Sequence, residues 1–168
     1  MTPEDSLLSI AEIAIGLAGF SGLVAAFSQR PGHAWRGDQK ARIVILVILS
    51  FATMISAILP FALSGIADSP ALIWGVPMVA YSAVALTLLF CWVVVARRRS
   101  YRLQFKFVSI PLLAVAGMVQ VLVGLSGLGV ILPYSPSLFV FGLLATLLFA
   151  ANLFLALLHI TWSDSGEA

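Results

Sequence analysis

The residue of this sequence with the clearest chemical potential is Glu12, an acid inside a long apolar run at 6–27. A carboxyl group inside a membrane span costs free energy and usually faces protein or water, so such a position is a candidate for function. Glu12 lies about six residues, or roughly 9 Å, from the beginning of its run. The alternative role is structural: near the membrane surface, where the cost is lower, the carboxyl caps or hydrogen-bonds a neighbouring helix.

The same run carries small residues at helical spacing, namely Gly16, Gly19, Gly22 and Ala26. Small residues let helices approach closely, and close packing holds spans together in lipid. Two interpretations remain open for this stripe. It packs within the protein, or it contacts copies of the same helix in a homo-oligomer. In the second case Glu12 forms a ring of carboxylates, as in the entrances of cation pores.

Polar side chains in later runs are candidates for a small polar cluster at the depth of Glu12. Thr53 and Ser56 share one face of the second run, and Tyr81 stands at a similar depth in the third. We predict that these residues meet Glu12. The prediction fails if Glu12 and Tyr81 lie on different sides of the bundle.

The fourth run carries a second small-residue stripe: Gly117, Gly124 and Gly127, with Gln120 between them. Gln120 lies near the middle of the membrane, so its amide must find a partner on another helix. Helix–helix adhesion is one interpretation, and a place on a transport pathway is the other.

The fifth run carries Asn152 and His159. A histidine titrates near physiological pH and can relay protons, although one at a helix end is also expected simply to be solvated. Glu12 and His159 belong near opposite membrane faces, roughly 20 Å apart by helix rise. They cannot form one catalytic or metal site, so we predict that the protein is not an enzyme and holds no metal.

Five apolar runs must position these side chains. They span about 6–27, 43–63, 72–96, 108–131 and 137–160. Each has about 20 residues or more, enough for an α-helix to cross a hydrocarbon core of about 30 Å. The sequence therefore predicts an all-α, polytopic transmembrane bundle of five spans, within one integral membrane domain over 1–168.

The nine Lys and Arg residues fall in two stretches, at 30–42 and 97–106. Basic residues close to membrane spans remain on the cytoplasmic side. The N-terminus is then outside and the C-terminus cytoplasmic. The second stretch also suits contact with anionic lipid. The alternative is that these residues serve only to set the topology. Its members are Arg97, Arg98, Arg99, Arg102 and Lys106.

Composition agrees with a membrane protein. Hydrophobic residues make up 61% of the chain and charged residues 10%, whereas a soluble domain carries about 25% charged residues. Such a chain offers no soluble face for nucleic acid, so none is expected as a partner. Cys91 is the single cysteine, which excludes an internal disulfide and a Cys-x-x-Cys metal site. No cofactor is predicted.

Residues 10–24 contain Leu-Ala-Gly-Phe-Ser-Gly at 17–22. This segment resembles the opening of small uncharacterised bacterial multi-span proteins. The resemblance covers 15 of the 168 residues. It implies a bacterial inner-membrane location. It gives no information about an activity.

These observations lead to two functional hypotheses. The first is a homo-oligomeric channel or small-ion transport protein, surrounded by membrane lipids, with Glu12 near the pathway. The second is a non-transporting membrane subunit that binds a partner protein or organises lipid, because no polar constellation of substrate size is recognisable.

Overall fold

The computed structural model of the protein describes residues 3–27, 37–98 and 106–163, and the side chains of 5–24, 26, 40–94 and 110–158. These segments contain six helical elements and the connections between them. The elements are α1 (Pro3–Phe27), α2 (Gly37–Ser64), the short π-helix η1 (Ala71–Gly75), α3 (Val76–Arg98), α4 (Lys106–Gly127) and α5 (Pro136–Ser163). The prediction of an all-α fold is confirmed for the described residues. Five of the helices are long and apolar enough to cross a membrane, as a multi-pass membrane protein requires.

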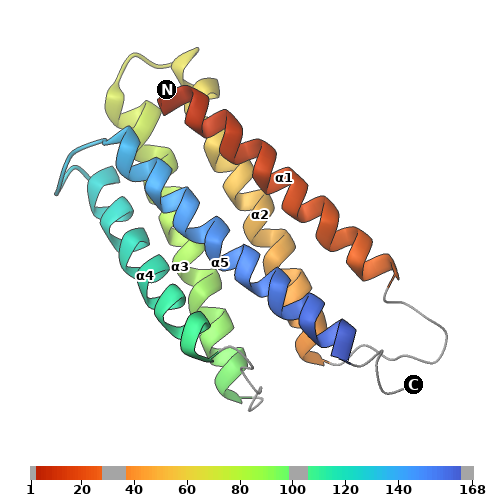
Figure 1. Cartoon of the computed structure of the whole chain (residues 1–168). Helices are drawn as coiled ribbons and strands as arrows, with labels where there is room; N and C mark the ends of the chain where they lie inside the picture. Colours follow the sequence, from red (N-terminus) through yellow and green to blue (C-terminus); the bar gives the residue numbers. More distant parts are fainter. Residues whose placement is uncertain (1–2, 28–36, 99–105, 164–168) are drawn as a thin grey trace.

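The five long helices run alternately up and down (Figure 1). α1 packs against α2 and α5, while α4 packs against α3 and α5. The beginning of α1 and the α2–α3 and α4–α5 connections lie at one end of the bundle. We call this the N-terminal end. The last turn of α5 lies at the opposite end, because an odd number of antiparallel helices places the beginning of the first helix and the end of the last on opposite sides.

The basic residues of the described helices gather at that opposite end, which we call the basic end. Lys40 and Arg42 stand near the beginning of α2, Arg97 and Arg98 at the end of α3, and Lys106 at the beginning of α4. Because neighbouring helices run antiparallel, the beginnings of α2 and α4 and the end of α3 all lie at this end. This clustering is the feature on which the topology prediction rests.

The π-helix before α3 corrects the prediction of one regular helix over 72–96. The backbone N–H of Val76 donates to the carbonyl oxygen of Ala71, five residues earlier. Pro77 follows directly; it has no N–H, and its ring would crowd the carbonyl four residues before it in a regular helix. A wider π turn accommodates this proline and brings Gly75 against α4, where an added Cβ would lie 2.9 Å from the Gly127 carbonyl oxygen.

The fourth helix ends earlier than the predicted boundary at residue 131. α4 stops at Gly127, and Gly129 adopts a positive φ of 76°. The N–H of Gly129 then reaches the Ser126 carbonyl and that of Val130 reaches the Leu125 carbonyl. This is the Schellman arrangement, which ends a helix at a residue that tolerates the left-handed conformation. Hydrophobicity continues to 131, but the helix does not.

Two clusters of buried side chains fill the bundle. The one nearer the N-terminal end is built around Tyr81 and Phe139, with Leu7, Ile10 and Leu143 among its members. The other, nearer the basic end, is centred on Trp92 and Phe149, with contributions from α2, α3, α4 and α5. Both clusters join helices that are far apart in the sequence.

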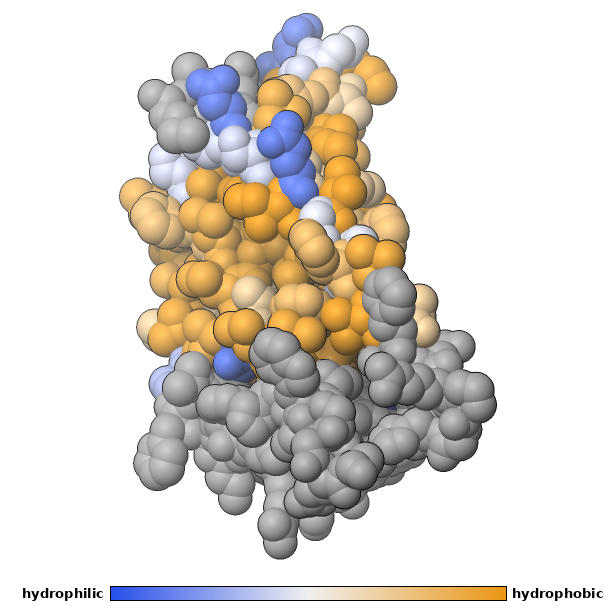
Figure 2. Space-filling model, turned by 45° about the vertical axis from the view of Figure 1, so that its right-hand side comes forward, coloured by the Kyte–Doolittle hydropathy of each residue, from blue (hydrophilic) through white to orange (hydrophobic). Residues whose placement is uncertain are grey.

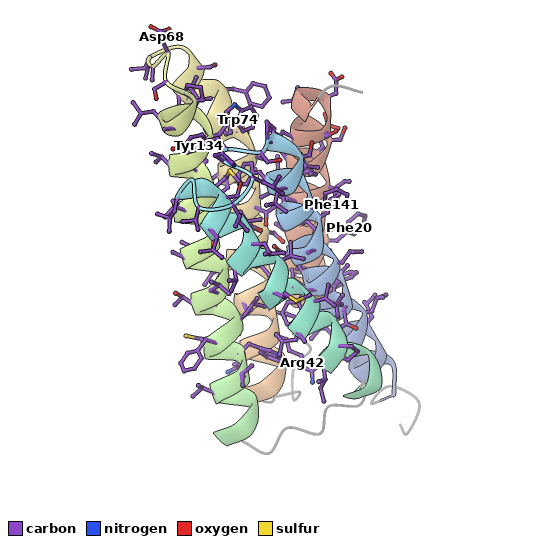
Figure 3. The ribbon with its side chains drawn as sticks, turned by 90° about the vertical axis from the view of Figure 1, so that its left-hand side faces the viewer. Phe20, Arg42, Asp68, Trp74, Tyr134 and Phe141 are labelled. Atoms are coloured by element: carbon purple, nitrogen blue, oxygen red, sulfur yellow. The ribbon has the colours of Figure 1, made fainter. Side chains whose placement is uncertain are left out.

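The outer surface is apolar as well. No candidate span has more than 44% of its residues buried inside the protein. Figure 2 shows orange side chains across the middle of the face that it draws, with blue side chains toward the N-terminal end. Large aromatic side chains also face outward: Phe20 of α1 and Phe141 of α5 point away from the bundle in Figure 3 and are 64% and 66% exposed. Lipid is the solvent compatible with this surface.

Candidate functional site

The helix α1 divides into a buried face and an outward face. Its buried side chains lie along one stripe of the helix, at Leu7, Ile10, Ala11, Ala14 and Ser21. Because an α-helix has 3.6 residues per turn, Glu12, Gly16 and Gly19 fall on the opposite side. All three are exposed. We call Glu12, Gly16, Gly19, Leu23 and Ala26 the outward face of α1.

The carboxyl group of Glu12 has no hydrogen-bond or ion-pair partner among the residues that the structure describes. The candidate span begins at Asp5 and ends at Val24, so Glu12 lies seven residues, about 10 Å, inside it. Its Cβ is tilted toward the helix N-terminus, as on every α-helix. The acid therefore leans toward the nearer membrane surface from within the apolar band.

The glycines of α1 leave open space around the helix. A Cβ added to Gly16, Gly19 or Gly22 would meet no atom within 4 Å. Ala26 is also exposed. These small residues therefore do not serve close packing within one protein copy, and the outward face of α1 is available to a neighbour in the membrane.

A buried polar network lies inside the bundle, away from Glu12. The hydroxyls of Thr53 on α2 and Tyr81 on α3 are 2.9 Å apart. Thr53 also donates to the Leu49 carbonyl at 2.8 Å, and the Tyr81 hydroxyl also lies near the side chain of Thr146 on α5. Tyr81 is 1% exposed. The structure thus joins Tyr81 to Thr53 as the sequence suggested.

The fourth member of the network is Gln120 of α4. Its Nε2 donates to the Gly142 carbonyl oxygen at 2.7 Å and to Thr146 Oγ1 at 2.9 Å. The prediction that this amide finds a partner on another helix is confirmed. Its Oε1 atom is buried and has no hydrogen-bond partner. The network, from Thr53 through Tyr81 and Thr146 to Gln120, links four helices.

Glycines allow the helices of this network to come close. A Cβ on Gly142 would lie 2.6 Å from Val123 Cγ2, and one on Gly124 would lie 2.7 Å from Ser82 Oγ. Ser82 Oγ in turn donates to the Gln120 carbonyl at 2.7 Å. Gly124 and Gly127 of the predicted stripe thus pack within the protein, while a Cβ at Gly117 would meet nothing within 4 Å.

The remaining predicted residues are not brought to one place. Ser56 and Asn152 are half-buried, and Asn152 makes a polar interaction. The prediction that the polar cluster includes Glu12 is wrong: Glu12 stays on the outward face of α1, outside the Thr53–Tyr81 pair, because α1 buries its opposite side against the bundle. His159 belongs to α5, but its side chain lies outside the described set. The same holds for the side chains of Arg97, Arg98 and Lys106, while Arg99 and Arg102 lie outside the described residues altogether.

Sequence reasoning missed three members of the interior. Gly142 and Thr146 stand four residues apart on α5, and this spacing on one face was the available signal. Arg42, interpreted only as a topological charge, is 3% exposed. Its guanidinium carbon lies 5.7 Å from the centroid of the Trp92 ring, a cation–π distance. Nothing in the local sequence of α2 indicates this burial.

Among the side chains that the structure describes, no group of three or more His, Cys, Asp or Glu residues is placed to hold a metal ion. No protein-family model, curated protein or solved structure matches the chain. The candidate sites are therefore judged by their geometry: an outward-facing acid on α1 and a hydrogen-bonded polar layer within the bundle.

Proposed function

We propose that the protein assembles with copies of itself through the outward face of α1 and passes small ions across the membrane, with Glu12 near the pathway. The observation that supports this proposal is the exposed carboxyl of Glu12, which has no partner within the described part of one copy. A carboxylate in contact with lipid is costly: insertion scales give about 2.5–3.5 kcal/mol for aspartate at a span centre. A neighbour or water removes that cost.

The glycines beside Glu12 favour a second copy as this neighbour. Open space at Gly16 and Gly19 lets another helix approach to backbone distance, as in small-residue interfaces between membrane helices. Copies inserted in the same orientation share a symmetry axis along the membrane normal, so Glu12 of each copy lies at the same depth. A ring of carboxylates selects cations.

The topology within this proposal follows the positive-inside rule. The basic end lies in the cytoplasm, with the C-terminus, and the N-terminus lies outside. Glu12 then occupies the outer half of the membrane. The resemblance of residues 10–24 to bacterial proteins favours the inner membrane of a bacterium.

The interior of one copy is a poor candidate for the pathway. Thr53 and Tyr81 hydrogen-bond each other between α2 and α3, Thr146 donates to the Gly142 carbonyl of its own helix, and the Gln120 amide nitrogen is held by two acceptors on α5. Groups committed to such bonds do not readily solvate a moving ion. We therefore assign the pathway to the space between copies, beside Glu12.

Ion flux in proteoliposomes tests the proposal. Purified protein is expected to give cation flux above that of empty vesicles, and Glu12→Gln, which keeps the shape and removes the charge, is expected to abolish most of it. The matched control is Asp68→Asn, because Asp68 is an exposed acid at the same end of the molecule but outside the candidate spans. Absence of flux, or flux that Glu12→Gln leaves unchanged, contradicts the proposal.

A second candidate is a non-transporting subunit that binds a membrane partner protein or organises lipid. The structural use of the interior polar groups favours it, since they leave no substrate-sized polar site among the described residues. In that case the outward face of α1 receives a helix of another protein. A specific partner that co-purifies in fixed stoichiometry supports this candidate. A closed homo-oligomeric ring with a water-filled axis overturns it.

A further inference from the structure

The amide group of Gln120 is held in one orientation by its partners on α5. Its Nε2 lies 2.7 Å from the Gly142 carbonyl oxygen and 2.9 Å from Thr146 Oγ1. A backbone carbonyl only accepts hydrogen bonds, so the nitrogen of the amide, and not its oxygen, must face Gly142. The amide oxygen, Oε1, is thereby turned away from this carbonyl.

The hydroxyl groups around this amide already use their hydrogens. Each hydroxyl has one hydrogen to donate. The donors and their acceptors are Thr146 to the Gly142 carbonyl at 2.7 Å, Ser82 to the Gln120 carbonyl at 2.7 Å, Thr53 to the Leu49 carbonyl at 2.8 Å and, since the Thr53 hydrogen is used, Tyr81 to Thr53 Oγ1 at 2.9 Å. None of these four groups has a hydrogen left for Oε1.

The Gln120 Oε1 atom is therefore a buried acceptor that lacks a donor. Gln120 is 0% exposed, and Oε1 has no hydrogen-bond partner among the described residues. Buried polar atoms in proteins are nearly always hydrogen-bonded, and an ordered water supplies the bond where side chains do not. The atom thus calls for a donor from a bound molecule.

The side chains beside this amide are small. A helical side chain leans toward the N-terminus of its own helix, so Gln120 covers the turn of α4 that holds Ala116. Ala85 of α3 and Ala150 of α5 stand at the same level, four residues beyond the polar network toward the basic end. All three alanines are 0% exposed. Three enclosed methyl groups occupy little volume, and this level of the core suits a donor of the size of water.

A second polar partner for such a water stands next to Oε1. Oε1 and Nε2 are bonded to the same carbon atom, and Nε2 is 2.9 Å from Thr146 Oγ1. A single water can therefore reach both Oε1 and Thr146 Oγ1. Thr146 Oγ1 accepts one hydrogen bond from Nε2 and has a further lone pair. The two hydrogens of a water molecule match these two acceptors.

We propose that the polar network binds one water molecule in the middle of the bundle. The water donates one hydrogen bond to Gln120 Oε1 and the other to Thr146 Oγ1, and it completes the hydrogen bonding between α4 and α5. This site is enclosed within one copy of the protein. It does not depend on ion passage or on the outward face of α1.

Water-edited solid-state NMR of the full chain in lipid bilayers tests the site, because it detects side chains that receive magnetisation from water. Glutamine and threonine are isotope-labelled, and the signals of Gln120 and Thr146 are identified by their loss in Gln120→Leu and Thr146→Val. We expect both side chains to receive magnetisation from water. Thr87 is the matched control, since it is a threonine within the candidate span of α3 that is exposed on the outer surface, where lipid surrounds it. We expect no transfer to Thr87.

The Gln120→Leu variant shows whether Oε1 holds the water. Leucine is apolar and offers no acceptor, so we expect the transfer to Thr146 to be lost. Transfer to Thr146 that Gln120→Leu leaves intact overturns the proposal, and so does a native chain in which Gln120 receives no more magnetisation than Thr87. Should Gln120→Leu fail to fold, Gln120→Met takes its place with the same expectation, and the comparison of Gln120 with Thr87 in the native chain decides on its own.

Discussion

The bond between Tyr81 and Thr53 allows a stability prediction to be worked from its geometry. Thr53 has one hydroxyl hydrogen, which goes to the Leu49 carbonyl at 2.8 Å. Tyr81 must therefore be the donor across the 2.9 Å contact with Thr53. Tyr81→Phe removes this donor and keeps the ring, including its edge-on contact with Phe139 at 6.2 Å between centroids. The perturbation is confined to the hydroxyl group.

The expected cost is modest, because the unfolded chain in a membrane also finds polar partners. Hydrogen bonds between membrane helices contribute about 0.6 kcal/mol on average and up to about 1.7 kcal/mol. The Tyr81 hydroxyl is fully enclosed and also contacts Thr146, so a loss of about 1 kcal/mol in unfolding free energy is expected. In a double-mutant cycle with Thr53→Val, a coupling of about 0.6 kcal/mol or more should remain.

Equilibrium unfolding of the full chain in mixed detergent–lipid micelles measures both quantities. Thr87→Val is the control, since the exposed Thr87 hydroxyl donates to the Ala83 carbonyl of its own helix at 2.7 Å and to no other group among the described residues. It should change stability by less than about 0.5 kcal/mol. If Tyr81→Phe costs no more than Thr87→Val, or if Tyr81 and Thr53 show no coupling, the hydrogen-bonded layer does not stabilise the bundle.

Three substitutions give further predictions for the same unfolding assay. Gly142→Ala places a methyl group 2.6 Å from Val123 Cγ2 and should cost about 1–3 kcal/mol by overpacking; a neutral result contradicts the close α4–α5 approach. Gly117→Ala meets open space and should stabilise the helix by up to about 1 kcal/mol, and destabilisation would contradict the open space around Gly117. Gln120→Leu loses two hydrogen bonds but also removes the unpartnered Oε1, so a change within about 1 kcal/mol is expected. A loss above about 3 kcal/mol in unfolding free energy would show that removing Oε1 does not offset the two lost hydrogen bonds.

The number and approximate extent of the helices could be predicted because they depend on one physical quantity, the length of apolar chain needed to cross lipid. The errors at boundaries have local causes. Hydrophobicity does not register the positive φ of Gly129, which ends α4, or the missing N–H of Pro77, which introduces a π turn. Helix continuity therefore depends on backbone constraints that a hydropathy pattern does not contain.

Depth along a helix could be predicted better than direction around it. Thr53 and Tyr81 stand at matching depths, and they meet. Glu12 has a similar depth but points outward, because α1 buries its Leu7–Ala14 side against the bundle. In a soluble protein the polar face of a helix indicates its outward side. Here both faces of each helix are apolar, so the polar face gives little indication of the outward side. Neither the outward orientation of Glu12 nor the burial of Arg42 could therefore be deduced.

Contact between α1 helices of neighbouring copies is the central claim, and site-specific crosslinking in the native membrane tests it most directly. Gly19→Cys in a Cys91→Ala background introduces a thiol on the outward face of α1, where the added Cβ meets no atom of the same copy. A disulfide requires Cα atoms within about 7 Å. The unmodified chain is the control, because its exposed Cys91 lies on α3. The account predicts efficient disulfide-linked dimers through residue 19 and few through residue 91. Absence of dimers at residue 19, or equal yields at both positions, would contradict it.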